Sequence, residues 1–168
     1  MKITYRLINI CMLALCVGAL LFAYYLQYGI ELFPCDLCLL QRAMLYTVVL
    51  FTLIAVLHNP KGFGRWGYSI LNICFAGIGA TIAGRQVYLQ QLPEDLKPSC
   101  GPGLEFMLNN MPFWEAIKTV ITGSGDCATI QWTLFGLSLP FWTGILFVVL
   151  LVGNVVALGA KIRSLKLK

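Results

Sequence analysis

Four of the seven cysteines lie where thiol chemistry is expected, in two groups that are far apart along the chain. Cys35 and Cys38 form a Cys-x-x-Cys motif directly after Pro34, at the head of an apolar run, whereas Cys100 and Cys127 share one polar segment. A Cys-x-x-Cys motif at a helix start favours thiolate over thiol, because the free backbone N–H groups and the helix dipole stabilise negative charge there. The sequence therefore predicts two dithiols that transfer electrons.

Arg42 extends the first of these groups. If Pro34 marks the start of a helix, Cys35, Cys38 and Arg42 stand at i, i+3 and i+7, on one stripe of that helix. Arg42 then lies about 6 Å along the axis from Cys38, so its guanidinium can reach the sulfur and favour the thiolate. A cation within a membrane span is costly and by default indicates function, although near a helix end it can also snorkel to the interface. Beside a Cys-x-x-Cys motif, we expect the functional role.

The elements that position these residues are membrane spans. Hydrophobic residues make up 59% of the 168-residue chain and charged residues only 11%, a composition typical of an integral membrane protein. Four apolar runs are near the roughly 20 residues that a helix needs to cross a ~30 Å hydrocarbon layer. None of them alternates like a barrel strand, so each is expected to be a helix. The predicted spans are residues 7–28, 39–57, 67–83 and 141–158.

The sequence thus predicts an all-α integral membrane protein, a single membrane domain over residues 1–168 built as a four-transmembrane-helix bundle.

The distribution of charged residues predicts the orientation of this bundle in the membrane. Eight basic residues and no acidic ones fall on one side: Lys2, Arg6, Lys61, Arg65, Lys161, Arg163, Lys166 and Lys168. By the positive-inside rule that side is cytoplasmic, as are both termini. The loops at about 29–38 and 85–140 are then extracytoplasmic, where disulfides persist. The net charge of +5 reflects this anchoring and does not indicate nucleic-acid binding.

The second outer loop is the only sizeable polar segment. Residues 104–121 repeat apolar side chains at a 3–4 spacing interrupted by Pro112, which predicts one or two short amphipathic helices. These helices lie on the membrane surface or pack on the ends of the bundle, and in either case they can carry Cys100 and Cys127. The remaining cysteines fall within spans, and we expect them to be small buried hydrophobic side chains: Cys11, Cys16 and Cys74.

A dithiol that faces lipid beside a fixed positive charge suits a lipid-soluble two-electron acceptor whose reduced form carries a negative oxygen. A quinone fits that description. The sequence contains no haem, flavin or iron–sulfur motif that could take the electrons instead. Spacing alone does not prove the acceptor.

At these residues the chain resembles the bacterial disulfide-bond formation protein B (DsbB) family of thiol:quinone oxidoreductases. The matching segments cover residues 34–42, 84–90 with Pro93, 100–104, 123–128 with Gln131 and Trp132, and 136–140. The resemblance implies a four-helix bundle in the bacterial inner membrane with its active cysteines in the periplasm. It also implies ubiquinone or menaquinone bound near the outer end of the second span, and a soluble thioredoxin-fold thiol oxidase of the DsbA type that this protein reoxidises.

The resemblance also implies a role for each site residue. Cys100 receives the attack of the partner's thiolate, and Cys127 is its pair, which passes the electrons on by attacking Cys35. Cys38 is then the thiolate next to the quinone, and Arg42 holds a quinone oxygen. This relay of thiol–disulfide exchange and quinone reduction is the one that keeps the bacterial periplasm oxidising.

Two positions bear on how this chain uses the family pattern. Gln86 follows Arg85 where many relatives carry a histidine, and the only histidine of this chain, His58, is predicted to be cytoplasmic. A quinone site here therefore lacks that histidine. Asp36 lies between the two cysteines of the motif and places a negative charge near Cys35, which opposes thiolate formation there.

Two other classes of function remain open from the sequence. The four cysteines could form a four-thiolate zinc site, but only Cys35 and Cys38 have chelating spacing, because 26 residues separate Cys100 from Cys127. The chain could also be a non-catalytic subunit whose disulfides brace the outer loop. Bracing disulfides resist reduction by mild thiols, whereas a relay needs labile ones.

Overall fold

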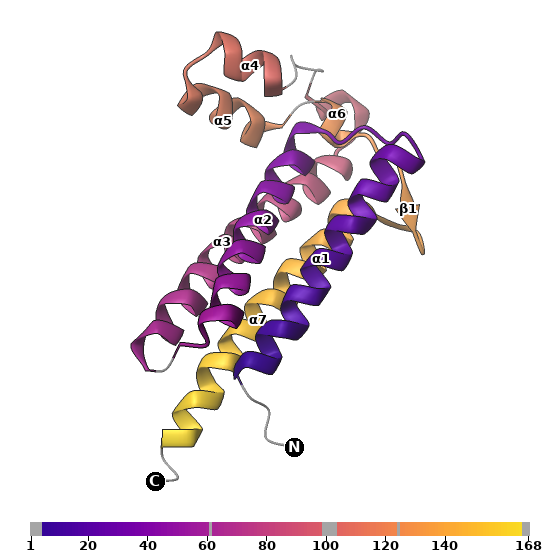
Figure 1. Ribbon diagram of the computed structural model, residues 1–168. Coiled ribbons are helices and arrows are strands. Elements are labelled where there is room, and N and C mark those ends of the chain that lie inside the picture. The colour runs from indigo at the N-terminus through magenta and orange to yellow at the C-terminus, as the bar shows by residue number, and fades with distance from the viewer. Residues whose placement is uncertain (1–4, 61, 99–103, 124, 166–168) are drawn as a thin grey trace.

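The computed structural model describes residues 5–60, 62–98, 104–123 and 125–165. Four long helices form a bundle (Figure 1): α1 (Tyr5–Gly29), α2 (Asp36–His58), α3 (Phe63–Gln90) and α7 (Leu139–Leu165). Each contains one of the predicted spans, and all four are long and apolar enough to cross a membrane. The chain is therefore an all-α, multi-pass membrane protein, as the sequence predicts.

The four helices run alternately up and down. In Figure 1 the start of α1 and the end of α7 lie at one end of the bundle, and the short helices of the second loop lie at the other. Helix α3 packs most extensively against α7 and α2. Gly79 makes the contact with α7 possible, since a Cβ there would lie only 2.4 Å from Cζ of the buried Phe147 ring. Small residues at such interfaces let transmembrane helices approach closely.

The cysteines within the spans do not all lie inside the bundle. Cys16 is fully buried among apolar side chains of the main core, as predicted. The prediction is wrong for Cys11 and Cys74, which are exposed on the outer surface of the bundle. Both residues sit on helix faces that point away from the neighbouring helices. Lipid tails are as apolar as a protein core, so hydropathy alone does not separate these two environments.

The second loop contains most of the remaining structure. Its elements are η1 (Glu94–Leu96), α4 (Leu104–Asn110), α5 (Phe113–Thr122), α6 (Gly125–Ala128) and a hairpin of β1 (Thr133–Leu134) with β2 (Leu137–Ser138). The predicted amphipathic segment is thus two helices, α4 and α5, and Pro112 caps the start of α5. Ala116 and Val120 are buried by packing on the bundle, whereas Trp114 on the opposite face is 76% exposed.

A second apolar cluster fixes the loop helices to the outer end of the bundle. Its buried members come from α2 to α6: Leu37, Leu89, Met107, Ala116, Val120, Cys127 and Ala128. Gly123 joins α5 to α6 with a φ of +94°, and a Cβ there would lie 2.4 Å from a methyl carbon of Leu89. Only glycine accepts both this backbone conformation and this close contact. The cluster therefore brings α6, and with it Cys127, onto the start of α2.

Candidate functional site

The Cys-x-x-Cys motif lies at the start of α2. Cys35 is the N-cap residue, with extended backbone, and its carbonyl accepts the first helical hydrogen bond from the Leu39 N–H at 3.0 Å. Cys38 falls in the first turn, where backbone N–H groups have no partner within the helix. The Cys35 thiol donates to the Cys38 sulfur, and the two Sγ atoms lie 3.1 Å apart. A disulfide bond is about 2.05 Å long, so a small movement separates this pair from a disulfide.

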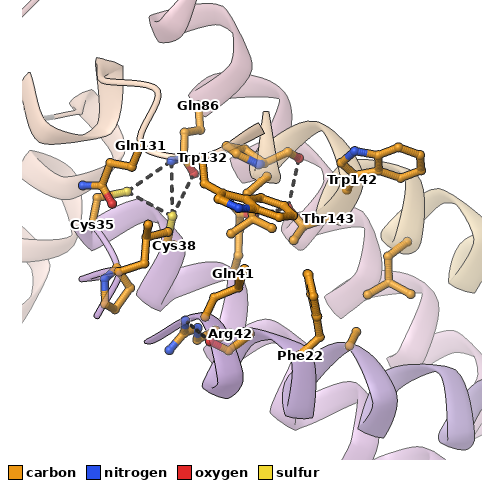
Figure 2. Close-up of a pocket in the computed structure, with 18 of the residues that line it drawn as sticks. Phe22, Cys35, Cys38, Gln41, Arg42, Gln86, Gln131, Trp132, Trp142 and Thr143 are labelled. Atoms are coloured by element: carbon orange, nitrogen blue, oxygen red, sulfur yellow. Dashed lines mark hydrogen bonds between the residues drawn. The ribbon is translucent and has the colours of Figure 1, made fainter. Parts of the chain in front are cut away.

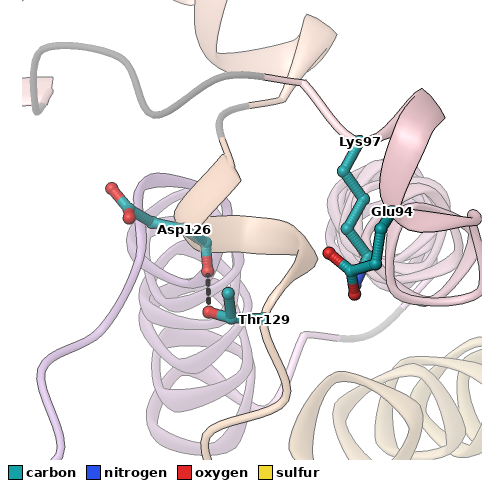
Figure 3. Close-up of polar contacts among 4 residues, drawn as sticks. All are labelled: Glu94, Lys97, Asp126 and Thr129. Atoms are coloured by element: carbon teal, nitrogen blue, oxygen red, sulfur yellow. Dashed lines mark hydrogen bonds and ion pairs between the residues drawn. The ribbon is translucent and has the colours of Figure 1, made fainter.

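Cys127 completes a group of three sulfurs. It lies in the single turn of α6, which the Thr129 hydroxyl closes by donating to the Asp126 carbonyl at 2.9 Å (Figure 3). Cys127 is fully buried beside Cys35. Hydrogen bonding to Cys127, then hydrogen bonding to Cys38, and then burial raise the pKa of the Cys35 thiol. The protonated form of Cys35 is therefore favoured in this arrangement.

Cys100, the other sequence-predicted cysteine of the loop, lies outside the described residues. The described segment before it contains η1, and Lys97, which directly follows η1, forms an ion pair of 2.6 Å with Glu94 (Figure 3). The structure thus brings together three of the four predicted cysteines and leaves the position of the fourth as a prediction.

Gln86 of α3 contacts both sulfurs of the motif. Its side-chain Nε2 lies 3.1 Å from Cys35 Sγ and 3.3 Å from Cys38 Sγ, and Figure 2 shows both sulfurs pointing toward this amide. Gln41 of α2 donates to Gln86 Oε1 at 2.7 Å, and the Thr143 hydroxyl of α7 lies 2.5 Å from Gln41 Oε1. Both glutamines are buried, with exposed fractions of 3% and 4%. Three helices therefore meet at the dithiol through uncharged side chains.

The sequence did not identify these partners as site residues. Gln86 is noticeable only as a departure from the family pattern. Gln41 had a clearer signal, because it stands three residues after Cys38 on the same face and is a polar residue within a span. Thr143 carries no signal of its own, since a threonine near a helix start is common.

Arg42 lies on the predicted side of α2 but binds another helix. Its guanidinium donates to Gln27 Oε1 and, at 3.2 Å, to the Ala23 carbonyl, both on α1. Its central carbon lies 5.7 Å from the centre of the Tyr24 ring. The sequence predicts that this guanidinium can reach the Cys38 sulfur, whereas its described contacts are with α1. Helix α1 offers Arg42 an amide oxygen, a carbonyl and an aromatic face, and Gln86 takes the place beside the sulfur.

A cavity of about 310 Å³ opens beside the dithiol. Cys35, Cys38, Gln86 and Arg42 all line it, together with apolar side chains of α1, α2 and α7 and of the segment around the hairpin. Its aromatic residues are Phe22, Phe33, Trp132, Trp142 and Phe147. The rings of Phe22 and Trp132 meet edge to face at 5.8 Å. The site is thus a mostly apolar pocket with a dithiol and a cation in its wall.

The described residues also bear on the four-thiolate zinc alternative. Among the described histidine, cysteine and carboxylate side chains, no group of three or more is arranged to hold a metal ion. Cys100, the fourth ligand of the proposed set, lies outside that part of the chain.

Comparison with known proteins agrees with the resemblance seen in the sequence. The family model described as "Disulfide bond formation protein DsbB" matches residues 5–157. The chain is 47% identical over 139 residues to disulfide bond formation protein B of Hahella chejuensis, which covers 83% of this chain and 84% of that protein. It is 44% identical over 137 residues to the protein of the same name from Marinobacter nauticus, covering 82% of each. The match to the protein of that name from Chromobacterium violaceum, at 39% identity, extends over 98% of this chain and 99% of the relative.

Proposed function

Because the chain belongs to the DsbB family of disulfide bond formation proteins, we propose that it is a protein dithiol:quinone oxidoreductase of the bacterial inner membrane. In this role it reoxidises a periplasmic thioredoxin-fold thiol oxidase of the DsbA type and passes the electrons to ubiquinone or menaquinone. One observation supports this role above the others. The Cys35–Cys38 dithiol lies next to Cys127 on one side and lines an apolar cavity on the other.

The arrangement of the bundle supports the proposed orientation. The start of α2, which carries the Cys-x-x-Cys motif, lies at one end, and the start of α1 and the end of α7 lie at the other (Figure 1). Arg65, one of the basic residues that predict the cytoplasmic side, donates to the Pro60 carbonyl at 2.7 Å, in the connection between α2 and α3 at that other end. With the basic end in the cytoplasm, the dithiol and the second loop face the periplasm.

The residues of the cavity fit a quinone. Its walls are apolar and aromatic, as a lipid-soluble ring requires, and Arg42 provides a cationic donor suited to a quinone oxygen. The volume of about 310 Å³ falls at the lower end of the range of about 300–1,000 Å³ seen for small-molecule sites. When bound, a quinone supplies the acceptor for two electrons and two protons.

The cysteines carry the electrons to this site by disulfide exchange. The partner's thiolate attacks Cys100 of a Cys100–Cys127 disulfide, so the bond between Cys100 and Cys127 breaks and Cys127 leaves as a thiolate. Cys127 then attacks Cys35, a Cys127–Cys35 disulfide forms, and the electron pair of the broken Cys35–Cys38 bond goes to the Cys38 sulfur. Each exchange breaks one disulfide and forms one, so atoms and electrons balance. Cys38 is left as a thiolate facing the cavity.

The direct test follows the absorbance of a soluble ubiquinone analogue mixed with a reduced thioredoxin-fold partner and a catalytic amount of this protein. We expect multiple turnovers in the wild type and none in Cys38→Ser. Cys11→Ser is the matched control, because Cys11 is an exposed cysteine on α1 outside the site, and it should keep full activity. Absence of turnover with both ubiquinone and menaquinone analogues would contradict the proposal and make zinc content the next measurement.

A further inference from the structure

We propose that Gln86 is a catalytic residue whose amide N–H group stabilises the Cys38 sulfur when the Cys35–Cys38 disulfide opens. We also propose that Gln41 and Thr143 are positioning residues that aim this amide at the sulfur. The inference rests on the proposed function and deepens it, because it identifies what holds the negative charge released by exchange.

The hydrogen bonds of the three side chains run in one direction. A carboxamide has one acceptor end and one donor end. Gln41 donates its amide to Gln86 Oε1 at 2.7 Å, so the donor end of Gln86 is the end that faces the two sulfurs. The Thr143 hydroxyl has two acceptors in range, Gln41 Oε1 at 2.5 Å and the Pro140 carbonyl at 2.9 Å, and the shorter contact is the one to Gln41. With its oxygen accepting from Thr143, Gln41 turns its amide N–H group toward Gln86. We call this chain of three side chains the amide relay.

Burial makes the relay costly to break. Gln41 and Gln86 are 4% and 3% exposed, and a buried amide without partners is strongly unfavourable. Turning both amides around would place Gln86 Oε1 against the sulfurs. A carbonyl oxygen and a thiolate are both acceptors and repel each other, so a charged Cys38 selects the observed orientation. When Cys38 is a neutral thiol, its S–H group can instead donate to Gln86 Oε1, which lies 3.6 Å from Cys38 Sγ.

The relay acts at the step where charge appears. When the Cys127 sulfur attacks Cys35, the Cys35–Cys38 bond breaks and its electron pair moves to Cys38 Sγ, 3.3 Å from the Gln86 amide. A hydrogen bond to an ionised acceptor is about twice as strong as one between neutral groups. The amide itself is neutral, so it stabilises the thiolate without placing a second charge in the low-dielectric interior.

The test measures the sulfur directly, in the absence of quinone and of the partner. In a Cys35→Ala background, Cys38 is alkylated with iodoacetamide at pH 7 in detergent, and peptide mass spectrometry gives its rate. Replacing Gln86 by methionine, which has similar length but no donor, should slow alkylation about tenfold, since only the thiolate reacts. Thr143→Val should slow it about two- to threefold, because Gln86 keeps its donor but loses its orientation, and Thr143→Ser should restore the rate.

Thr47→Val is the matched control, because the Thr47 hydroxyl donates at 2.7 Å only to the carbonyl of Met44 in its own helix. Its alkylation rate should equal that of the background protein. An unchanged rate in Gln86→Met with an unchanged melting temperature would overturn the relay. If Gln86→Met does not fold, an unchanged rate in the milder Thr143→Val would overturn it equally. Slower alkylation in both variants, together with no quinone turnover in the wild type, would support the relay and refute only the quinone reaction.

Discussion

The guanidinium of Arg42 donates a hydrogen bond to the backbone carbonyl of Ala23, 3.2 Å away on the neighbouring helix. The guanidinium also donates to Gln27 and lies against the face of the Tyr24 ring, so α1 supplies three contacts to the cation. Arg42 nevertheless lines the cavity beside the dithiol. Its positive charge is therefore held in place by α1 at the wall of the pocket.

Arg42→Ala should raise the apparent KM for a quinone analogue about tenfold, because one charged hydrogen bond to the bound oxygen is lost. Arg42→Lys should have an intermediate KM, since an ammonium keeps the charge but not the planar fork that bonds two partners on α1 at once. Initial rates against quinone concentration give these values. Arg65→Ala, at the opposite end of the bundle, is the control. An unchanged KM in Arg42→Ala would show that Arg42 does not contact the quinone and serves only to bind α2 to α1.

The sequence was sufficient for the spans and for the loop helices. Hydropathy and length predict a transmembrane helix because one segment satisfies all of its own backbone groups. Pro112 marks the break between α4 and α5 for an equally local reason, since proline begins helices well and interrupts them badly. Both features depend on neighbours in the chain, and both appear in the structure where the sequence places them.

The partners of the site residues could not be predicted in the same way. Spacing along α2 places Cys35, Cys38 and Arg42 on one stripe, but it does not say which helix lies opposite each of them. The structure places α3 beside the sulfurs, through Gln86, and α1 beside Arg42. These contacts depend on packing between segments that are distant in the sequence.

Cys100→Ala should abolish oxidation of a reduced thioredoxin-fold partner, because the partner's thiolate then has no disulfide to attack. A small dithiol such as dithiothreitol should still be oxidised slowly, since it can reach the Cys35–Cys38 disulfide without the loop cysteines. Parallel assays with the two reductants and the same quinone analogue distinguish these routes. Full activity of Cys100→Ala toward the protein partner would refute the assigned order of the cysteines.

Gly79→Ala should destabilise the bundle, because the added Cβ would lie 2.4 Å from the ring of Phe147, which is fully buried between α3 and α7. Overpacking of this kind costs about 1–3 kcal/mol, which a thermal melt in detergent resolves. Gly77→Ala is the matched control on the same helix, since a Cβ there meets no atom within 4 Å. Phe147→Leu should rescue much of the loss in Gly79→Ala. Equal melting temperatures for both glycine variants would contradict the close packing of α3 on α7.

Cys127→Ala should make Cys35 more reactive in the reduced protein. Hydrogen bonding to Cys127 is the largest cause that raises the pKa of the Cys35 thiol, so its removal should move that pKa back toward the value of about 8.5 for a free cysteine. The raised pKa means that the wild-type thiol stays protonated at pH 8 and that its thiolate forms only as the pH rises further. At pH 8, iodoacetamide should therefore label Cys35 faster in Cys127→Ala than in the wild type, as read by peptide mass spectrometry.

The same shift fixes the sign of a pH effect on stability. The folded protein holds the Cys35 proton more tightly than the unfolded chain does. Above about pH 8.5 the unfolded chain loses this proton while the folded protein keeps it, so the contribution of Cys35 to the free energy of unfolding falls as the pH rises. Reduced wild-type protein should accordingly lose melting temperature between pH 8 and pH 10 more steeply than reduced Cys127→Ala. Slower labelling of Cys35 in Cys127→Ala, or melting temperatures that fall equally with pH in the two proteins, would show that Cys127 does not raise the pKa of Cys35.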